Sequence, residues 1–270
     1  MVTALILVFI FGTIIGSFLN VLIFRLPAEE SINGRSQCRS CKHKLDIADL
    51  VPVLSFLYLK GRCRYCKDRV SWQYISVEVI TGLLFTLGYY MVFKDAGYSS
   101  FSLGLDYFRM IFVISVLIVV FMIDLKHFLI LDKVIFPATF LLFLIDWSIY
   151  WIGSGDILES VPVTGVLSGL IAFIFFGLIY LLSRGRWLGL GDVKFVWFLG
   201  LAVPWPLIFV NIFLAFGIGA VVGIFLLLTK TKKLSSQIAF GTFLSASCII
   251  AMFWGQQIFS WYLNLIGFHS

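Results

Sequence analysis

Charged residues are scarce in this chain of 270 residues. Asp, Glu, Lys and Arg make up 13% of it, whereas 61% of the residues are hydrophobic and the mean hydropathy is +1.04. Ordinary soluble domains are about 45–50% apolar, so this composition excludes a soluble domain. Together with its long apolar runs, it predicts an all-α polytopic membrane protein.

Three further features are missing from the sequence, and each absence argues against one class of function or ligand. The basic residues are spread over several short loops rather than gathered on one face, which argues against nucleic acid as a partner. No glycine-rich strand-to-helix motif for a nucleotide is present. We also find no convincing internal repeat, although many secondary transporters are built from such repeats.

The first apolar run lacks the marks of a removable signal peptide. No basic leader precedes it and no small-residue cleavage site follows it, and polar Asn20 comes after Gly16 and Ser17 within the run. We therefore expect this segment to stay in the protein as its first transmembrane helix.

Apolar runs near the length needed to cross a bilayer predict about eight transmembrane helices, of which the sixth is short. They lie roughly at 2–24, 75–93, 107–124, 134–152, 161–183, 193–204, 207–229 and 243–266. The predicted organisation is a first transmembrane helix at 1–24, a cytosolic four-cysteine insert at 25–73 and a transmembrane core at 74–270.

The positions of Lys and Arg predict the orientation in the membrane. Eighteen of these 20 residues fall in 25–73, 125–133, 184–194 and 230–233, and only Lys94 and Arg109 flank the other side. Cytoplasmic loops carry the positive excess, so the insert should be cytosolic and both termini should lie outside the cytosol. The net charge of +6 therefore reflects topology.

Four of the five cysteines form two C-x2-C pairs in the insert, Cys38 with Cys41 and Cys63 with Cys66. Two such pairs can supply the four thiolates of a tetrahedral structural zinc site, and an insert of this size has little core of its own. Two disulfides are the alternative, although stable disulfides are rare in the reducing cytosol. Cys248, in an apolar span, is expected to be a packing residue.

Two carboxylates stand at membrane boundaries on the predicted cytosolic side. Asp124 ends one apolar run, and Asp192 begins another after Gly189 and Gly191. Such a pair can hydrolyse a peptide bond if the ionised carboxyl deprotonates water and the protonated one polarises the carbonyl. Helix dipoles favour Asp192 as the base and Asp124 as the acid. Alternatively, each aspartate merely marks a helix end.

Two other aspartates are lesser candidates. Asp132 lies in a basic loop, and Asp146, beside Trp147, is expected at the outer membrane interface. Lys126 and Lys194 stand two residues after the two candidate carboxylates and are interpreted as positive-inside anchors.

The chain resembles the bacterial type IV prepilin peptidases, which are G-x-G-D aspartyl proteases, over nearly its whole length. The likeness rests on Gly16-Ser-Phe-Leu-Asn-Val-Leu-Ile-Phe-Arg-Leu-Pro27, the two cysteine pairs, Asp124-Leu-Lys-His-Phe-Leu-Ile-Leu-Asp132 and Gly189-Leu-Gly-Asp-Val-Lys194. A weaker resemblance to the family's carboxyl-terminal segment is found in Ala239-Phe-Gly-Thr-Phe-Leu.

This resemblance implies that Asp124 and Asp192 are catalytic and that residues 74–270 form an aspartyl protease core. It implies a multi-pass enzyme of the bacterial cytoplasmic membrane that cleaves the leaders of prepilins and pseudopilins where these substrates enter the lipid. Members with the cysteine insert generally also methylate the new amino terminus with S-adenosylmethionine. Gly61 and Glu78 are our candidate positions for that activity. Packing of the turn around the second cysteine pair would also explain Gly61, and a carboxylate at the membrane interface would also explain Glu78.

Two other classes of function stay open. In a proton-coupled membrane transporter, the two aspartates would relay protons, but they are placed at one membrane face rather than at the midplane. In a non-catalytic assembly factor, the zinc insert would bind a partner and loss of the carboxylates would be harmless.

Overall fold

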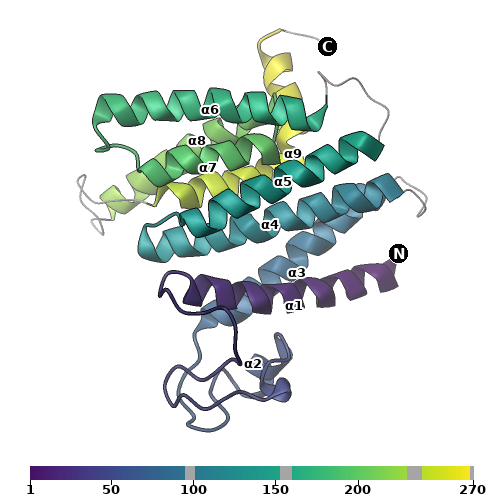
Figure 1. Cartoon of the computed structure of the whole chain (residues 1–270), viewed down its shortest axis with the longest axis vertical. Coiled ribbons are helices and arrows are strands. Elements are labelled where there is room, and N and C mark those ends of the chain that lie inside the picture. Colours follow the sequence, from purple (N-terminus) through teal and green to yellow (C-terminus); the bar gives the residue numbers. More distant parts are fainter. Residues whose placement is uncertain (95–100, 153–159, 230–238, 268–270) are drawn as a thin grey trace. The chain divides into compact units, whose positions relative to one another are not determined.

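The computed structural model describes residues 1–94, 101–152, 160–229 and 239–267. The chain divides into two compact units, Met1–Leu103 and Gly104–Ser270. Apart from two isolated β-bridges, the regular elements of the described residues are all helices (Figure 1). Seven of them are long and apolar enough to cross a membrane, and a four-cysteine cluster lies between the first two. The predicted all-α polytopic fold is therefore confirmed.

In the first unit, α1 (Val2–Arg25) packs closely against α3 (Trp72–Phe93). A Cβ atom at Gly12 would lie 2.7 Å from the Cα atom of Gly82, and one at Gly16 would lie 2.7 Å from the Cα atom of Glu78. Small residues four apart let two membrane helices approach to backbone contact. The glycines of α1 thus bring Glu78 directly against the first helix.

The insert between these helices holds two similar turns, which we call the first knuckle (36–45) and the second knuckle (61–70). Each contains one antiparallel bridge, Gln37 with Lys44 and Arg62 with Arg69. Backbone hydrogen bonds of 2.8–2.9 Å flank each bridge. Two short helices, η1 (Ile47–Asp49) and α2 (Leu54–Tyr58), connect the knuckles.

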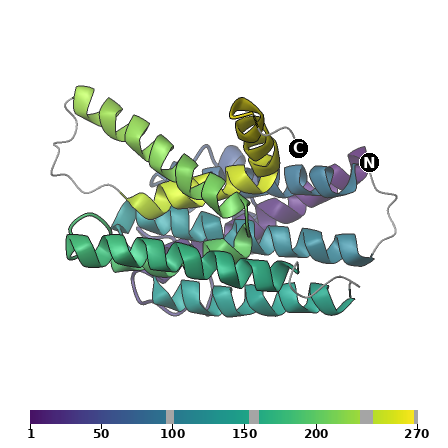
Figure 2. The same cartoon turned by 90° about the horizontal axis from the view of Figure 1, so that it is seen from above.

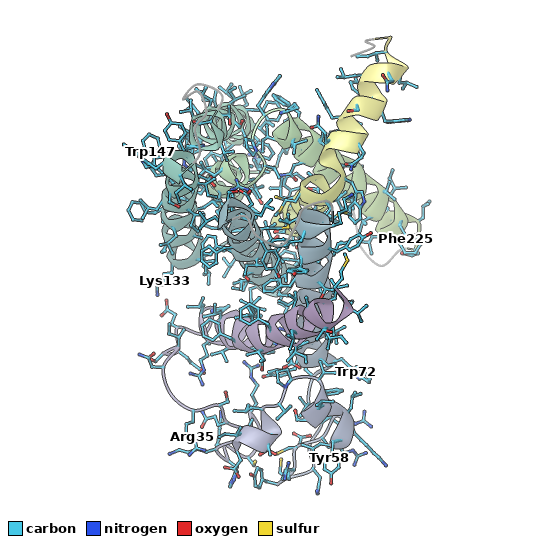
Figure 3. The ribbon with its side chains drawn as sticks, turned by 90° about the vertical axis from the view of Figure 1, so that its right-hand side faces the viewer. Arg35, Tyr58, Trp72, Lys133, Trp147 and Phe225 are labelled. Carbon is cyan, nitrogen blue, oxygen red and sulfur yellow. The ribbon has the colours of Figure 1, made fainter. Side chains whose placement is uncertain are left out.

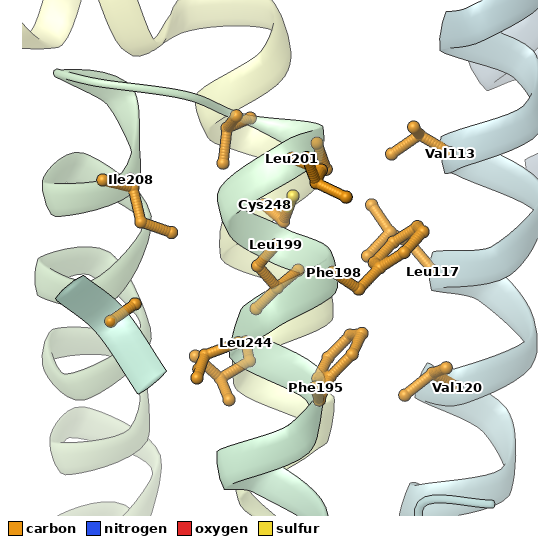
Figure 4. Close-up of a cluster of buried hydrophobic side chains, with 14 of the residues drawn as sticks. Val113, Leu117, Val120, Phe195, Phe198, Leu199, Leu201, Ile208, Leu244 and Cys248 are labelled. Atoms are coloured by element: carbon orange, nitrogen blue, oxygen red, sulfur yellow. The ribbon is translucent and has the colours of Figure 1, made fainter. Parts of the chain in front are cut away.

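The described residues of the second unit form six helices. They are α4 (Phe101–His127), α5 (Asp132–Ile152), α6 (Val161–Ser183), α7 (Leu190–Ala202), α8 (Leu207–Leu228) and α9 (Phe240–Leu265). Its core forms around α7, whose Phe195, Phe198 and Leu199 are fully buried among side chains of α4, α8 and α9 (Figure 4). Cys248 of α9 belongs to this core, as expected for a packing residue. The helices α8 and α9 pack against each other (Figure 2).

Helix α7 corresponds to the short sixth run of the sequence. Its 13 residues extend only about 20 Å, less than the roughly 30 Å of a bilayer core, so it is not among the seven long helices. It packs tightly on α6, where a Cβ atom at Gly200 would overlap the backbone of Gly169. A short helix can run at this depth because other helices, rather than lipid, surround it.

A buried ion pair holds the carboxyl end of α7. The Arg109 Nε atom of α4 donates to Asp146 Oδ1 of α5 at 2.5 Å, and Arg109 Nη2 donates to the carbonyl of Leu201 at 2.6 Å. Asp146 is 0% exposed, so protein rather than solvent or lipid surrounds it, and its expected position at the outer interface stays a prediction. The arginine neutralises it and also satisfies a carbonyl at the helix end that has no intrahelical partner.

Candidate active site

Asp124 lies in the last turn of α4 and is only 5% exposed. Its Oδ2 atom accepts hydrogen bonds from the Thr242 N–H at 2.7 Å and from the Thr242 hydroxyl at 3.2 Å. Thr242 is the third residue of α9, and N–H groups in the first turn of a helix have no partner within it. Asp124 therefore caps α9 from a different helix.

Gly241 makes this contact sterically possible. A Cβ atom there would lie 2.9 Å from Asp124 Oδ2 and 2.8 Å from Ile130 Cδ1. Real Cβ atoms essentially never come so close, so any larger residue would displace the carboxylate or the isoleucine. The segment Phe240-Gly241-Thr242 thus fits against Asp124 both by its hydrogen bonds and by its lack of a side chain.

Asp192 is the third residue of α7 and is 8% exposed. Its Oδ2 atom accepts a hydrogen bond from the Gly189 N–H at 3.2 Å, which caps the start of α7. The sequence predicted both helix-end positions, Asp124 at the end of one helix and Asp192 at the start of another. The structure agrees with both positions.

The backbone segments beside the two carboxylates pack on one side chain. Ile130, in the loop between α4 and α5, is the nearest neighbour of a Cβ atom built at Gly191 and of one built at Gly241. Asp192 is also close enough to Asp124 to interact with it electrostatically. The fold thus brings two carboxyls that are 68 residues apart in sequence within electrostatic range of each other, and each accepts its hydrogen bonds from the start of a helix.

An ion pair joins the two sequence motifs beside the carboxylates. The Lys194 ammonium donates to Asp132 Oδ1 at 2.9 Å and to Oδ2 at 2.7 Å. Both side chains are partly exposed, so the pair contributes little to stability. The ion pair matters for geometry, because it connects the first residue of α5 to the fifth residue of α7. Lys194 therefore has a definite partner in addition to the anchoring role read from the sequence.

The four cysteines of the insert meet at one point, where their Sγ atoms all lie within 4.8 Å of one another. The Sγ atoms of Cys38 and Cys66 are 3.8 Å apart. Tetrahedral zinc with Zn–S bonds of about 2.3 Å separates its sulfurs by roughly 3.8 Å. All five cysteines of the chain are free thiols. The arrangement therefore fits a four-thiolate metal site better than two disulfides.

The local backbone favours a thiolate in this cluster. Burial raises the pKa of the Cys38 thiol, but hydrogen bonds from the Cys41 and Ser40 N–H groups and from the neighbouring thiols of Cys63 and Cys41 together bring that pKa down to about 7. Thiolates are the form that binds metals, so one ligand is already near its binding state at neutral pH.

Gly61 and Glu78 lie in different surroundings. Gly61 has a φ of +68° and packs on the Phe56 ring, which accounts for a glycine at that position. Glu78 is 7% exposed, and its Oε2 atom accepts a hydrogen bond from the Val53 N–H at 2.8 Å. Val53 has a φ of +63°, which is rare for a β-branched residue, so this contact holds a strained backbone.

Two features of the second unit escaped sequence reasoning. Thr242 lies in a segment that only weakly resembles the carboxyl-terminal segment of the family. Nothing in a single sequence shows that its hydroxyl faces Asp124. Arg109 and Asp146 are 37 residues apart on different helices, so no short motif could reveal them. A lone arginine and a lone aspartate in membrane spans are the signal that could have suggested a pair.

Comparison with known protein families finds two matching segments in the chain. Residues 111–224 match the type IV leader peptidase family, and residues 10–92 match the bacterial peptidase A24 N-terminal domain. No solved structure matches the chain.

Several curated relatives share the name prepilin leader peptidase/N-methyltransferase. The protein of Aeromonas salmonicida strain A449 is 30% identical over 96% of this chain and 94% of its own length. That of Bacillus subtilis strain 168 is 29% identical over 96% and 98%. That of Pseudomonas aeruginosa is 28% identical over 95% and 92%. The chain therefore belongs to the type IV leader peptidase family.

Proposed function

We propose that this protein removes the leader peptides of type IV prepilins and pseudopilins at the cytosolic face of the bacterial cytoplasmic membrane and then N-methylates the new amino terminus. One observation supports the peptidase function: Asp124 and Asp192, from the two family motifs, are both buried and close enough to interact electrostatically. The alignment with full-length relatives supports the same activity.

The proposed peptidase reaction needs only the two carboxyls and a water molecule. The ionised carboxylate takes a proton from water, and the resulting hydroxide oxygen bonds to the scissile carbonyl carbon. The protonated carboxyl gives its proton to the carbonyl oxygen at the same time. Collapse of this tetrahedral intermediate breaks the C–N bond. The proton first taken from water passes to the leaving nitrogen, and a hydroxyl of the intermediate returns a proton to the carboxyl that acted as the acid, which restores both groups.

The hydrogen bonds favour Asp124 as the ionised member. It accepts two hydrogen bonds at the positive end of α9, whereas Asp192 accepts one longer bond from its own helix start. Hydrogen bonds from donors stabilise a carboxylate over a carboxylic acid, as does a helix amino terminus. We therefore assign Asp124 as the base and Asp192 as the acid, which reverses the assignment made from the helix ends of the sequence alone.

The position of the pair argues against transport. Both carboxylates lie at helix termini, Asp124 in the last turn of α4 and Asp192 in the first turn of α7. Transporter sites usually lie near the bilayer midplane. A site at the membrane boundary suits a substrate whose apolar helix remains in lipid while its leader stays in the cytosol. If the short α7 is counted as an eighth crossing, the positive-inside rule puts both termini of the enzyme outside the cytosol, and we keep that proposal.

We assign zinc to the cysteine cluster because its donors are four thiols near tetrahedral spacing. The insert has little core of its own, since Cys63 is the only fully buried hydrophobic residue described between α1 and α3. A metal ion bound by Cys38, Cys41, Cys63 and Cys66 would supply the missing cross-links. Its role would be structural, because four protein ligands leave no open position for substrate.

For methyl transfer, we propose that Glu78 contacts the S-adenosylmethionine or the amine that it methylates. When bound, S-adenosylmethionine supplies an electrophilic methyl group. One helical turn from Glu78, Asn20 of α1 donates to the Tyr74 carbonyl of α3 at 3.0 Å; it is 1% exposed, and its Oδ1 atom accepts no hydrogen bond within the described residues. A buried carboxylate and a free amide oxygen are suited to an ammonium group. Gly61 has a structural explanation and is not needed here.

The catalytic pair is tested by cleavage of a purified prepilin in detergent. Replacing Asp124 or Asp192 with Asn should each lower the cleavage rate by about 10³-fold, because each substitution removes one proton-transfer group. Asp106→Asn is the matched control, since Asp106 is an exposed residue of the same helix α4. Full activity of either site variant would exclude this mechanism.

Thr242 should affect the rate through Asp124. Thr242→Val removes one hydrogen bond to the carboxylate at nearly constant volume, so we expect a roughly tenfold loss of kcat. The acidic limb of the pH–rate profile should also move to higher pH, because the ionised base is less stabilised. Thr242→Ser should restore both. A loss that is equal at every pH, or that serine does not rescue, would make the hydroxyl merely structural.

The metal assignment predicts one zinc ion per chain, measured by elemental mass spectrometry of the purified protein. Cys63→Ser should abolish zinc binding, whereas Cys248→Ser should keep it because Cys248 lies in the core around α7. Removal of zinc by a chelator should make residues 25–73 sensitive to protease. Zinc content unchanged in Cys63→Ser would refute the site.

The methyl-transfer proposal predicts that the cleaved product gains the mass of one methyl group when S-adenosylmethionine is added. Glu78→Gln should lose this gain while still cleaving the substrate, since Glu78 belongs to the first unit and the catalytic pair to the second. The control is Glu30→Gln, an exposed residue of the insert. Methylation by Glu78→Gln at the normal rate would remove Glu78 from the site.

A further inference from the structure

A cleft of about 770 Å³ lies in the first unit, between α2, the second knuckle and the start of α3. Three cations, Lys60, Arg62 and Arg69, contribute to its lining. The rings of Phe56 and Trp72, 5.3 Å apart, form an aromatic part of the same lining. Its size is that of a small-molecule site, and its charge calls for an anion.

The two arginines stand directly opposite each other in the bridge of the second knuckle. The Cys63 N–H donates to the Asp68 carbonyl and the Val70 N–H to the Gly61 carbonyl, both at 2.8 Å, so the bridged pair itself exchanges no hydrogen bonds. In such a pair, the side chains leave the same face of the ribbon and lie especially close. Like charges at this spacing destabilise the turn unless an anion lies between them.

The neighbouring knuckle shows that this charge pair is not required by the fold. The first knuckle has the same bridge and flanking hydrogen bonds, but it places neutral Gln37 opposite Lys44. Arg64, one residue beyond Cys63, is neutralised by Asp49 at 2.6 Å. Within the described part of the chain, neither Arg62 nor Arg69 forms an ion pair.

The cleft opens where the chain enters the membrane. Trp72 is both part of its lining and the first residue of α3, a helix long and apolar enough to span a bilayer. Its side chain is 74% exposed, and Figure 3 shows it between α3 and the insert that carries Tyr58. Tryptophan is enriched at headgroup level, so we infer that this cleft lies at the depth of lipid phosphates.

We propose that this cleft binds the headgroup of an anionic phospholipid, whose phosphate lies between Arg62 and Arg69 and whose acyl chains follow α3 into the bilayer. The phosphate relieves the repulsion between the arginines and accepts their N–H groups, while Lys60 adds a third positive charge. Basic clusters next to a membrane span are suited to such lipids. This site depends only on the membrane setting, so it is independent of the carboxylate chemistry.

The experiment measures lipid retention by native mass spectrometry of the full-length protein in detergent, after addition of phosphatidylglycerol or phosphatidylcholine. We expect the wild type to retain phosphatidylglycerol in preference to phosphatidylcholine. The double variant Arg62→Gln/Arg69→Gln should retain it about 30-fold less, since each cation near a lipid surface contributes roughly a fivefold factor. Glycerol phosphate, the soluble headgroup, should compete only at much higher concentration.

The matched control is Lys44→Gln/Lys67→Gln, which removes the same charge from the two knuckles at positions outside the cleft lining. It should retain phosphatidylglycerol like the wild type. Equal retention of both lipids by the wild type would overturn the proposal, and so would equal losses in the two double variants. Competition by glycerol phosphate at the concentration of the lipid would assign the cleft to a free anion instead. Unchanged zinc content and prepilin cleavage show that each variant is folded.

Discussion

The contact between Asp124 and the first turn of α9 is the interaction on which the proposed chemistry depends. Asp124 ends α4, where the carbonyl dipoles of its own helix oppose a negative charge. The Thr242 N–H and hydroxyl offset this effect by donating to its Oδ2 atom. A carboxylate can therefore be kept in a site that is only 5% exposed. Without α9, the same residue would be an unpaired buried charge.

The short helix α7 makes the second carboxylate available at the same place. Its tight contact with α6 through Gly200 and its capping by Arg109 fix the helix along its length. Asp192, in the first turn, is thereby held at a definite position, and the preceding Gly191 packs on Ile130. A longer helix facing lipid would not need the ion pair of Arg109 with Asp146. The desolvation cost of this pair is tolerated only because protein surrounds it. Packing in the core thus positions the chemistry at the membrane boundary.

Sequence reasoning predicted much of this molecule because its main signals are local. Apolar runs located the seven long helices, and the spacing of the cysteines anticipated the cluster in the insert. Helix ends also placed Asp124 and Asp192 correctly. What it missed depends on tertiary contacts: the buried environment of Asp146, the partner of Lys194 and the role of Thr242. Each of these involves residues at least 37 positions apart, where no periodicity or motif connects the partners.

The central claim is that Asp124 and Asp192 act as one unit that exchanges a proton. Single-turnover cleavage rates of the wild type, the two Asp→Asn variants and their double variant test it most directly. If the carboxyls work together, the second substitution adds little to the first, because either one already disables the unit. If the double variant instead loses the product of the two single effects, the carboxyls act independently and the account is contradicted.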